Sequence, residues 1–176
     1  MDICLQEMDI SDVPRKYNWR LNERHYGELT GLNKDEMKKV YGKKKIQIFR
    51  RSWNVAPAPL DKNNPYHPIN IKIYKGISLE KIPSTESLKD VHNRVMPYFK
   101  NNIEKLLNNK KNVIISAHGN SIRALCKTLF NLSKTNIRKL EIPTGNPLLI
   151  KFEDKLKINN CYYLDQSRSK DLLIKF

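Results

Sequence analysis

The sequence has few cysteines and no long apolar run, and these two absences exclude several classes of protein. No apolar stretch approaches the roughly 18 residues that a membrane-spanning helix needs, and residues 1–7 include acids but no signal-peptide core. The three cysteines, Cys4, Cys126 and Cys161, are far apart and form no C-x-x-C pair, which favours neither a disulfide framework nor a zinc site. We therefore expect free thiols, no membrane association and a reducing compartment, most simply the cytoplasm.

Acidic residues are also in short supply. The chain has 18 Asp and Glu against 33 Lys and Arg, a net charge of +15, and this surplus favours anionic partners, either nucleic acids or phosphorylated metabolites. Its 24 lysines occur together with 19 asparagines and are spread along the chain, which favours a drift in composition over a designed basic stripe. No aromatic-basic recognition motif accompanies the charge, so we expect no nucleic-acid partner.

Length and composition predict one folded domain over residues 1–176. The chain has 176 residues, close to the roughly 150 that a domain contains, and 39% of them are hydrophobic, which permits a packed core. There is no internal repeat. The proline-rich stretch from Asn54 to Pro68 is expected to be an irregular loop and not a domain boundary.

Two helices are predicted in the first two thirds of the chain. Asn33 is typical of an N-cap, so that a helix covers 34–41 and ends at Gly42. Apolar residues recur every three or four positions from Ser87 to Leu107, which predicts an amphipathic helix with a kink at Pro97.

The remaining third alternates between strand and helix patterns. The run 113–117 is apolar on both alternating faces, as in a strand buried in a parallel sheet, and residues 122–132 are again helical in pattern. Residues 147–152 and 156–164 read as two strands joined by a hairpin turn at 153–155. This order predicts an α/β layered fold, and it places His118 at the C-terminal end of a strand.

The turn Ala117-His118-Gly119-Asn120-Ser121 is the first candidate site. Ligands gather at the carboxyl ends of strands in α/β sheets, and the amides that open the next helix can bind an anion. Gly119 would let the backbone approach a phosphate, His118 would face the same anion, and Asn120 or Ser121 could cap the helix. A histidine that only packs at a turn explains the local pattern about as well.

Two further segments carry polar side chains that are hard to explain as core. The stretch 19–34 places acid, base, imidazole and phenol between two apolar anchors, with glycines beyond them, which favours backbone bent around a ligand over a solvated surface. Arg50 and Arg51 are either ordinary surface arginines or a planar clamp for a carboxylate or phosphate.

Taken together and in order, these segments resemble one family closely. The chain is similar to the 2,3-bisphosphoglycerate-dependent phosphoglycerate mutases of the histidine phosphatase superfamily, in register from about Ile3 to about Leu164. The stretches that carry the resemblance are WRLNERHYGELTGLNK at 19–34, FRRSWNVAPAP at 49–59, ESLKDV at 86–91, AHGNSIRAL at 117–125 and PTGNPLL at 143–149.

The resemblance implies a three-layer α/β fold with a mostly parallel sheet flanked by helices. It also implies an isomerase of glycolysis and gluconeogenesis that moves a phosphoryl group between the hydroxyls of 2- and 3-phosphoglycerate through a phosphorylated histidine. Glu23 would exchange the hydroxyl proton and His118 would steady the phosphoryl group in flight. Residues matched to substrate binding are Glu23, Arg24, His25, Tyr26, Lys34, Arg50, Arg51, Gly119 and Asn120.

The same resemblance implies the small molecules involved. 2,3-Bisphosphoglycerate would prime the reaction, no metal is needed, and the partner is a small phosphoglycerate substrate. The oligomeric state is open, a homo-oligomer included.

One family motif is absent from the sequence. Members begin with a strand that ends in Arg-His-Gly, whose histidine is phosphorylated, but of His25, His67, His92 and His118 only His118 precedes a glycine, and it belongs to the second motif. We therefore expect an N-terminally truncated chain without the first strand and helix, whether Met1 is an internal methionine of a longer reading frame or the gene is decaying. Unpaired backbone, an uncovered apolar face and poor stability are expected to follow. The alternative function is a catalytically inactive remnant that binds phosphometabolites.

Overall fold

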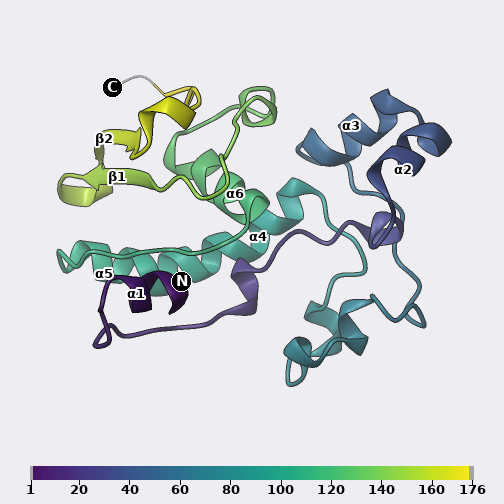
Figure 1. Cartoon of the computed structure of the whole chain (residues 1–176), viewed down its shortest axis with the longest axis horizontal. Helices are drawn as coiled ribbons and strands as arrows, with labels where there is room; N and C mark the ends of the chain where they lie inside the picture. The colour runs from purple at the N-terminus through teal and green to yellow at the C-terminus, as the bar shows by residue number, and fades with distance from the viewer. Residues whose placement is uncertain (1, 175–176) are drawn as a thin grey trace.

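A computed structural model describes residues 2–174, with the exception of the Lys34 side chain. Its helices and strands are α1 (Asp2–Glu7), α2 (Lys34–Tyr41), α3 (Lys43–Arg51), α4 (Leu88–Tyr98), α5 (Glu104–Asn108), α6 (Gly119–Leu129), β1 (Leu148–Phe152) and β2 (Ile158–Tyr163). Figure 1 shows α4, α5, α6 and the β1–β2 hairpin together, with α2 and α3 set apart on the other side of the molecule. No helix within residues 2–174 is long and apolar enough to cross a bilayer.

The predicted helix at 34–41 is confirmed as α2. The Asn33 side chain accepts a hydrogen bond from the backbone N–H of Asp35 at 2.8 Å, which satisfies one of the free donors of the first turn. Gly42 follows with a φ of 77°, a left-handed value that glycine adopts without steric cost, and the chain turns at once into α3. The sequence does not predict α3, because its apolar residues are few and lie among lysines.

The long helix predicted over 87–107 is confirmed, with a break in its middle. Ser87 and Asp90 form a reciprocal capping box at the start of α4. After Pro97 the helix widens into a π-helical turn, Phe99–Ile103, before α5 resumes. Proline lacks the N–H that would bond one turn back and its ring crowds that carbonyl, which is the reason for the predicted kink at Pro97.

The main core lies where α4 packs against α6. Val91 and Val95 of α4 and Ala124 of α6 are at most 1% exposed. The partly buried strand residues Leu148 and Ile150 pack against the same cluster. A second, small cluster of Met37, Ile46 and Phe49 joins α2 to α3. The predicted helix at 122–132 is thus confirmed, and it begins three residues earlier than predicted.

The C-terminal hairpin is also confirmed. β1 and β2 are antiparallel, with Leu149 opposite Tyr162 and Ile150 opposite Cys161, and a bulge occurs at Lys151/Phe152. Tyr163, only 1% exposed, donates its hydroxyl to the carbonyl of Glu141 at 2.9 Å and ties the hairpin to the segment after α6.

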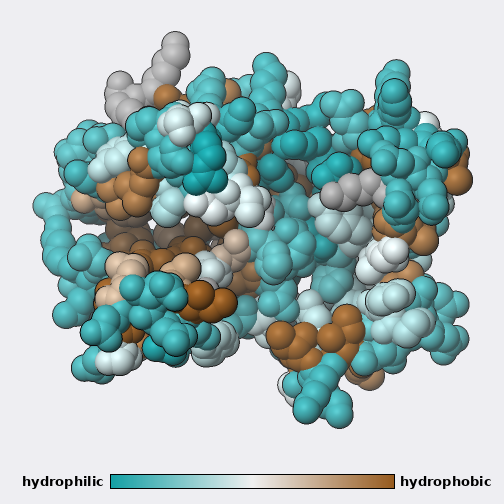
Figure 2. All heavy atoms as spheres, in the orientation of Figure 1, coloured by the Kyte–Doolittle hydropathy of each residue, from teal (hydrophilic) through white to brown (hydrophobic). Residues whose placement is uncertain are grey.

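The predicted buried strand at 113–117 is wrong for this structure. The sheet that residues 2–174 form is the antiparallel β1–β2 pair, and residues 113–117 make no backbone hydrogen bond within that range. Val113 and Ile115 pack on the core, whereas Ile114 is 75% exposed. An extended segment forms a β-strand only where a neighbouring strand supplies hydrogen-bond partners, so an apolar pattern by itself does not establish a strand. Figure 2 shows apolar side chains in a hollow between the hairpin and α5.

The proline-rich loop holds a buried histidine in one tautomer. His67 is fully buried, its Nε2 lies 2.9 Å from the Ser84 hydroxyl, and its Nδ1 accepts a hydrogen bond from the N–H of Ile69 at 3.2 Å. Because Nδ1 accepts, the ring carries its proton on Nε2 and is neutral. Burial lowers the pKa of His67 below its ordinary value of 6.5, and Lys62 lowers it further.

We expect acid to destabilise the protein through His67. Near pH 6.5 the imidazole of the unfolded chain takes up a proton that the folded chain does not yet bind. The contribution of His67 to the free energy of unfolding is therefore fully present above that pH. It is lost as the pH falls through the lowered pKa of the folded state. Urea unfolding between about pH 7.5 and 5 should show a shallower pH dependence for His67→Asn, whose side chain can still accept from Ile69. Parallel pH profiles for the two proteins would contradict this assignment.

Candidate functional site

The segment around Glu23 is held in place by one largely buried arginine. Arg94 of α4 donates hydrogen bonds to the backbone carbonyls of Arg20 at 2.6 Å, Asn22 at 3.0 Å and Glu23 at 3.1 Å. It also bonds both carboxylate oxygens of Glu86, at 2.6 and 3.0 Å, and the two side chains are 10% and 3% exposed. These three carbonyls are therefore paired, which holds the loop against α4.

Glu23 faces the start of α6. Its Oε1 accepts hydrogen bonds from the backbone N–H of Arg24 at 2.7 Å and from the Asn120 side-chain amide at 2.9 Å. Its Oε2 lies 3.9 Å from Nδ1 of His118. The two side chains are 35% and 65% exposed, so solvent and a ligand can reach both. The structure thus brings an acid and an imidazole together across 95 residues of sequence.

The α6 end of the site is built differently from the sequence-based expectation. His118 is the residue before the helix, with no side chain that caps it, and neither Asn120 nor Ser121 acts as the cap. Both point instead to the Glu23 segment: Ser121 donates to the carbonyl of Asn22 at 2.6 Å, and Asn120 bonds Glu23 and the Tyr26 hydroxyl, the latter at 2.8 Å. The helix amides remain available, and the space beside Gly119 is open, with no atom within 4 Å of a Cβ placed there.

Arg123 sets the direction in which the Asn120 amide points. It donates to Asn120 Oδ1 at 2.6 Å, which turns the NH₂ group toward Glu23 and Tyr26, and its Nε donates to the carbonyl of Leu140 at 2.9 Å. Burial lowers the pKa of Arg123, and the nearby guanidinium of Arg51 lowers it further.

Arg24 is buried against Tyr26, and one nitrogen of its guanidinium has no hydrogen-bond partner among the described residues. It is 2% exposed, and it donates to the carbonyls of Glu86 at 2.6 Å and Val55 at 3.3 Å, while its guanidinium lies over the Tyr26 ring at 5.2 Å. Burial lowers its pKa, opposed by Tyr26 and Glu86. Its Nη1 has no hydrogen-bond partner among the described residues. A buried cationic donor of this kind is costly unless an acceptor arrives.

His25 contacts the other side of the loop. Its backbone N–H donates to Glu86 at 2.9 Å and its Nε2 lies 2.8 Å from the Tyr74 hydroxyl. Burial lowers the pKa of His25, with Glu86 opposing the shift. His25 thus helps to hold the loop that carries Glu23. No contact joins its ring to His118 in the described structure.

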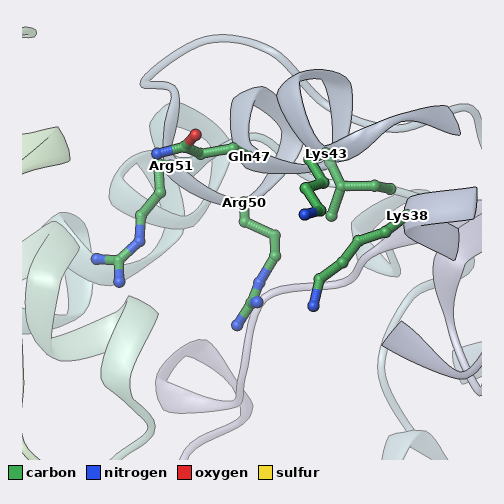
Figure 3. Close-up of a pocket in the computed structure, with 6 residues that line it drawn as sticks. Lys38, Lys43, Gln47, Arg50 and Arg51 are labelled. Carbon is green, nitrogen blue, oxygen red and sulfur yellow. The ribbon is translucent and has the colours of Figure 1, made fainter. Parts of the chain in front are cut away.

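The two arginines of the predicted clamp line one cavity between α2 and α3, together with Lys38, but they have different surroundings. Figure 3 shows the two side chains extending to the same side of α3, with Arg51 the farther from Lys38. Arg51 forms an ion pair with Glu141 at 3.7 Å, on the side of Arg123. Lys34 is the first residue of α2, and its side chain lies outside the described residues.

Three structural residues of the site were missed from the sequence, namely Glu86, Arg94 and Arg123. Arg94 comes three residues after Val91 and so shares the buried face of its helix, and a charged residue on such a face signals a buried pair. Glu86 and Arg123 belong to stretches that were recognised as motifs, but only their tertiary partners show what they do.

We expect Gly27→Ala to disrupt the site loop. Gly27 has a φ of 56°, and a Cβ there would lie 2.1 Å from the carbonyl oxygen of Ala58 and 2.7 Å from the Thr85 hydroxyl. The clash and the strain together should cost about 2–3 kcal/mol or more in urea unfolding. Gly76→Ala is the matched control, since its φ is 86° but nothing lies within 4 Å, and it should cost only about 1 kcal/mol. Equal losses in both variants would contradict the close-packing argument.

No group of three or more His, Cys, Asp or Glu side chains suited to a metal ion occurs in the described part of the chain. The groups that the described structure brings together at the site are a carboxylate, an imidazole, helix amides and buried cations. Such groups can hold an anion and exchange a proton with it.

Comparison with known proteins gives the chain its relatives. The histidine phosphatase superfamily (branch 1) matches residues 62–160, a range that contains Glu86, Arg94 and the 118–123 turn but not Glu23. A 2,3-bisphosphoglycerate-dependent phosphoglycerate mutase of Pelagibacter ubique is 62% identical over 156 residues, 89% of this chain and 66% of the relative.

Two further relatives carry the same name. The protein of Hydrogenobaculum sp. is 46% identical over 164 residues, which cover 93% of this chain and 66% of the relative. The protein of Borrelia garinii is 47% identical over 174 residues, which cover 98% and 70%. The chain thus spans about two thirds of the length of the curated relatives it matches.

Proposed function

Because the chain belongs to the 2,3-bisphosphoglycerate-dependent phosphoglycerate mutases of the histidine phosphatase superfamily, we propose that it takes part in the interconversion of 2- and 3-phosphoglycerate. The reaction belongs to glycolysis and gluconeogenesis, and we place it in the cytoplasm, with a small phosphoglycerate as substrate. The single observation that supports this most is the position of Glu23 Oε2, 3.9 Å from His118 Nδ1, at the open end of α6.

Each residue of the cluster has a role that its surroundings support. Oε1 of Glu23 is occupied by two hydrogen bonds, which leaves Oε2 to exchange a proton with a substrate hydroxyl. His118, exposed and next to free helix amides, can steady a phosphoryl group together with the backbone of Gly119. Arg51 would bind substrate from the side of Arg123.

The donors of the site suit a bisphosphorylated primer. The spare Nη1 of buried Arg24 and the free amides that open α6 are the groups that would hold 2,3-bisphosphoglycerate, with Asn120 as a further contact. When bound, this molecule supplies the phosphoryl group that primes the reaction. No step through a metal is part of the proposal.

A second function uses the same binding groups. The amides that open α6 and the exposed His118 can hold an anion without any transfer of its phosphoryl group. The alternative is a protein that binds phosphometabolites and does not turn them over.

Titration of the full chain with 3-phosphoglycerate, followed by amide NMR, tests the binding that both functions share. Saturable shifts are expected at the amides of residues 23–26 and 118–123. Shifts scattered over exposed lysines and suppressed by salt would refute a specific site.

A coupled mutase assay with 2,3-bisphosphoglycerate as primer then separates the two functions. Interconversion, with phosphohistidine detected after acid-free digestion, supports the mutase. Binding without interconversion and without phosphohistidine selects the alternative.

A further inference from the structure

Arg123 of α6 lies one side chain behind Glu23. Its Nη1 donates a hydrogen bond to Asn120 Oδ1 at 2.6 Å, and Asn120 in turn donates from its side-chain amide to Glu23 Oε1 at 2.9 Å. Arg123 and Asn120 are three residues apart on the helix, so their side chains share one face of it. A chain of two hydrogen bonds thus joins the guanidinium of Arg123 to the carboxylate of Glu23.

The guanidinium of Arg123 is also anchored outside α6. Its Nε donates to the carbonyl of Leu140 at 2.9 Å, and Leu140 is fully buried. A guanidinium is planar and rigid, so hydrogen bonds at two of its nitrogens fix the direction of the whole group. Arg123 therefore presents its donors to Asn120 from a fixed position.

The amide of Asn120 has one orientation that suits all three of these neighbours, Arg123, Glu23 and Tyr26. Arginine has donors and no acceptor, and an ionised carboxylate has acceptors and no donor. The amide therefore turns its oxygen to Arg123 and its NH₂ group to Glu23. The same NH₂ group donates to the Tyr26 hydroxyl at 2.8 Å, so both of its hydrogens are used. A rotated amide would put its oxygen against the carboxylate and its NH₂ group against a cation.

The orientation of Asn120 affects which carboxylate oxygen of Glu23 is held. Oε1 accepts from the Asn120 amide and from the backbone N–H of Arg24 at 2.7 Å, whereas Oε2 lies 3.9 Å from Nδ1 of His118. Without the amide, Oε1 would keep one of its two hydrogen bonds. The terminal torsion of a glutamate is broad, so the carboxylate would then rotate more freely and Oε2 would lose its fixed distance from His118.

We propose that Arg123 is a positioning residue for proton exchange at Glu23, and that it acts through the side-chain amide of Asn120. The inference rests on the proposed function, because that function assigns the proton exchange to Glu23. It goes further in giving a role to a side chain that is not among the groups proposed to hold substrate or primer.

Arg123→Met tests the proposal in the coupled mutase assay. Methionine fills similar space without a donor, and kcat should fall about tenfold or more, because a small displacement of a reacting group has an effect of this size. KM for 3-phosphoglycerate should change less than about threefold, since the lost interaction acts on the reacting group and not on substrate binding. A rise in KM with unchanged kcat would make Arg123 a binding residue and would overturn the proposal.

Lys127→Met is the matched control. Lys127 is a cation of the same helix, seven residues from Asn120, and its Nζ donates to the carbonyl of Leu132 at 2.9 Å in a partly buried setting. The substitution removes a positive charge and a carbonyl contact at a distance from the site, so kcat should change less than about twofold. Equal losses in Arg123→Met and Lys127→Met would show a general effect of charge or helix stability and would refute the positioning role.

A double-variant cycle tests the route through Asn120. Once the amide is removed in Asn120→Ala, Arg123 has no amide to orient. The double variant Asn120→Ala/Arg123→Met should therefore have the kcat of Asn120→Ala to within about twofold. Losses that multiply in the double variant would mean that Arg123 acts by another route, which contradicts the proposal.

The side-chain amide of Asn120 provides a readout that needs no turnover. Its NH₂ signals, followed by ¹⁵N–¹H NMR of the full chain, should exchange with water about fivefold faster or more in Arg123→Met, because the hydrogen bonds to Glu23 and Tyr26 are no longer enforced. Unchanged exchange would overturn the proposal. A parent chain that does not interconvert the phosphoglycerates counts against the proposed function instead, and the amide exchange still shows whether Arg123 orients Asn120.

Thermal unfolding followed by circular dichroism checks that each variant is folded. If Arg123→Met does not fold, Arg123→Lys replaces it. One ammonium group cannot bond Asn120 and Leu140 in the directions that the guanidinium does, so kcat should fall about threefold and the NH₂ exchange of Asn120 should become faster. Parental values of both quantities in Arg123→Lys would contradict the proposal.

Discussion

Arg94→Ala is expected to lower the free energy of unfolding by about 3–5 kcal/mol, because it leaves the Glu86 carboxylate buried without its cation. Glu86 is 3% exposed and bonds Arg94 through both oxygens. The substitution also removes the donors that hold the carbonyls of Arg20, Asn22 and Glu23, so the candidate site loosens together with the core. Urea unfolding followed by circular dichroism measures the loss.

Arg15→Ala is the matched control for this experiment. Arg15 also pairs with a carboxylate, that of Asp2 at 3.5 Å, but the two side chains are 40% and 59% exposed. Water screens such a pair, so its removal should cost less than about 1 kcal/mol. Arg94→Lys should be intermediate, since a lysine keeps the charge but cannot reach five acceptors in one plane. A loss from Arg94→Ala no larger than that from Arg15→Ala would show that the buried pair does not hold the loop.

Glu23→Gln is expected to reduce mutase turnover on the order of 10²-fold or more, because an amide cannot exchange the hydroxyl proton. The same variant should fold normally. The amide oxygen of a glutamine can still accept from the Arg24 N–H and the Asn120 side chain, which now bond Oε1 at 2.7 and 2.9 Å. Interconversion of the two phosphoglycerates, primed with 2,3-bisphosphoglycerate, gives the turnover, and urea unfolding checks the fold.

Binding provides an independent readout for Glu23. Removing a negative charge that faces an anionic ligand should leave 3-phosphoglycerate bound at least as tightly as before. His118→Ala should also lower turnover on the order of 10²-fold, but it should weaken binding, because a donor to the phosphoryl group is lost. Near-normal turnover in Glu23→Gln would remove Glu23 from the proton-exchange role, and weaker ligand binding would make it a structural residue.

The helices α2 and α4 and the hairpin were predictable because their signals are local. Asn33 and Gly42 bound α2 by backbone chemistry within a few residues, and the apolar stripe of α4 continues on both sides of Pro97. The hairpin follows from two apolar runs separated by a polar turn. The α/β class implied by the family agrees with these elements.

The segment at 113–117 shows what local signals cannot predict. Its residues have strand propensity, and Val113 and Ile115 face the core, but a strand also needs hydrogen-bond partners that no local pattern supplies. In the described structure, residues 113–117 make no backbone hydrogen bond with any other segment.

Taken by itself, the sequence determined the family, the elements that local rules specify and the residue types of the site, since motifs and periodicity are properties of neighbouring residues. Tertiary structure alone decided that Arg94 and Glu86 hold the Glu23 loop, that Asn120 faces this loop instead of capping α6, and that Arg51 pairs with Glu141. The physical reason is that a buried charge or amide adopts the direction in which partners distant in the chain satisfy it.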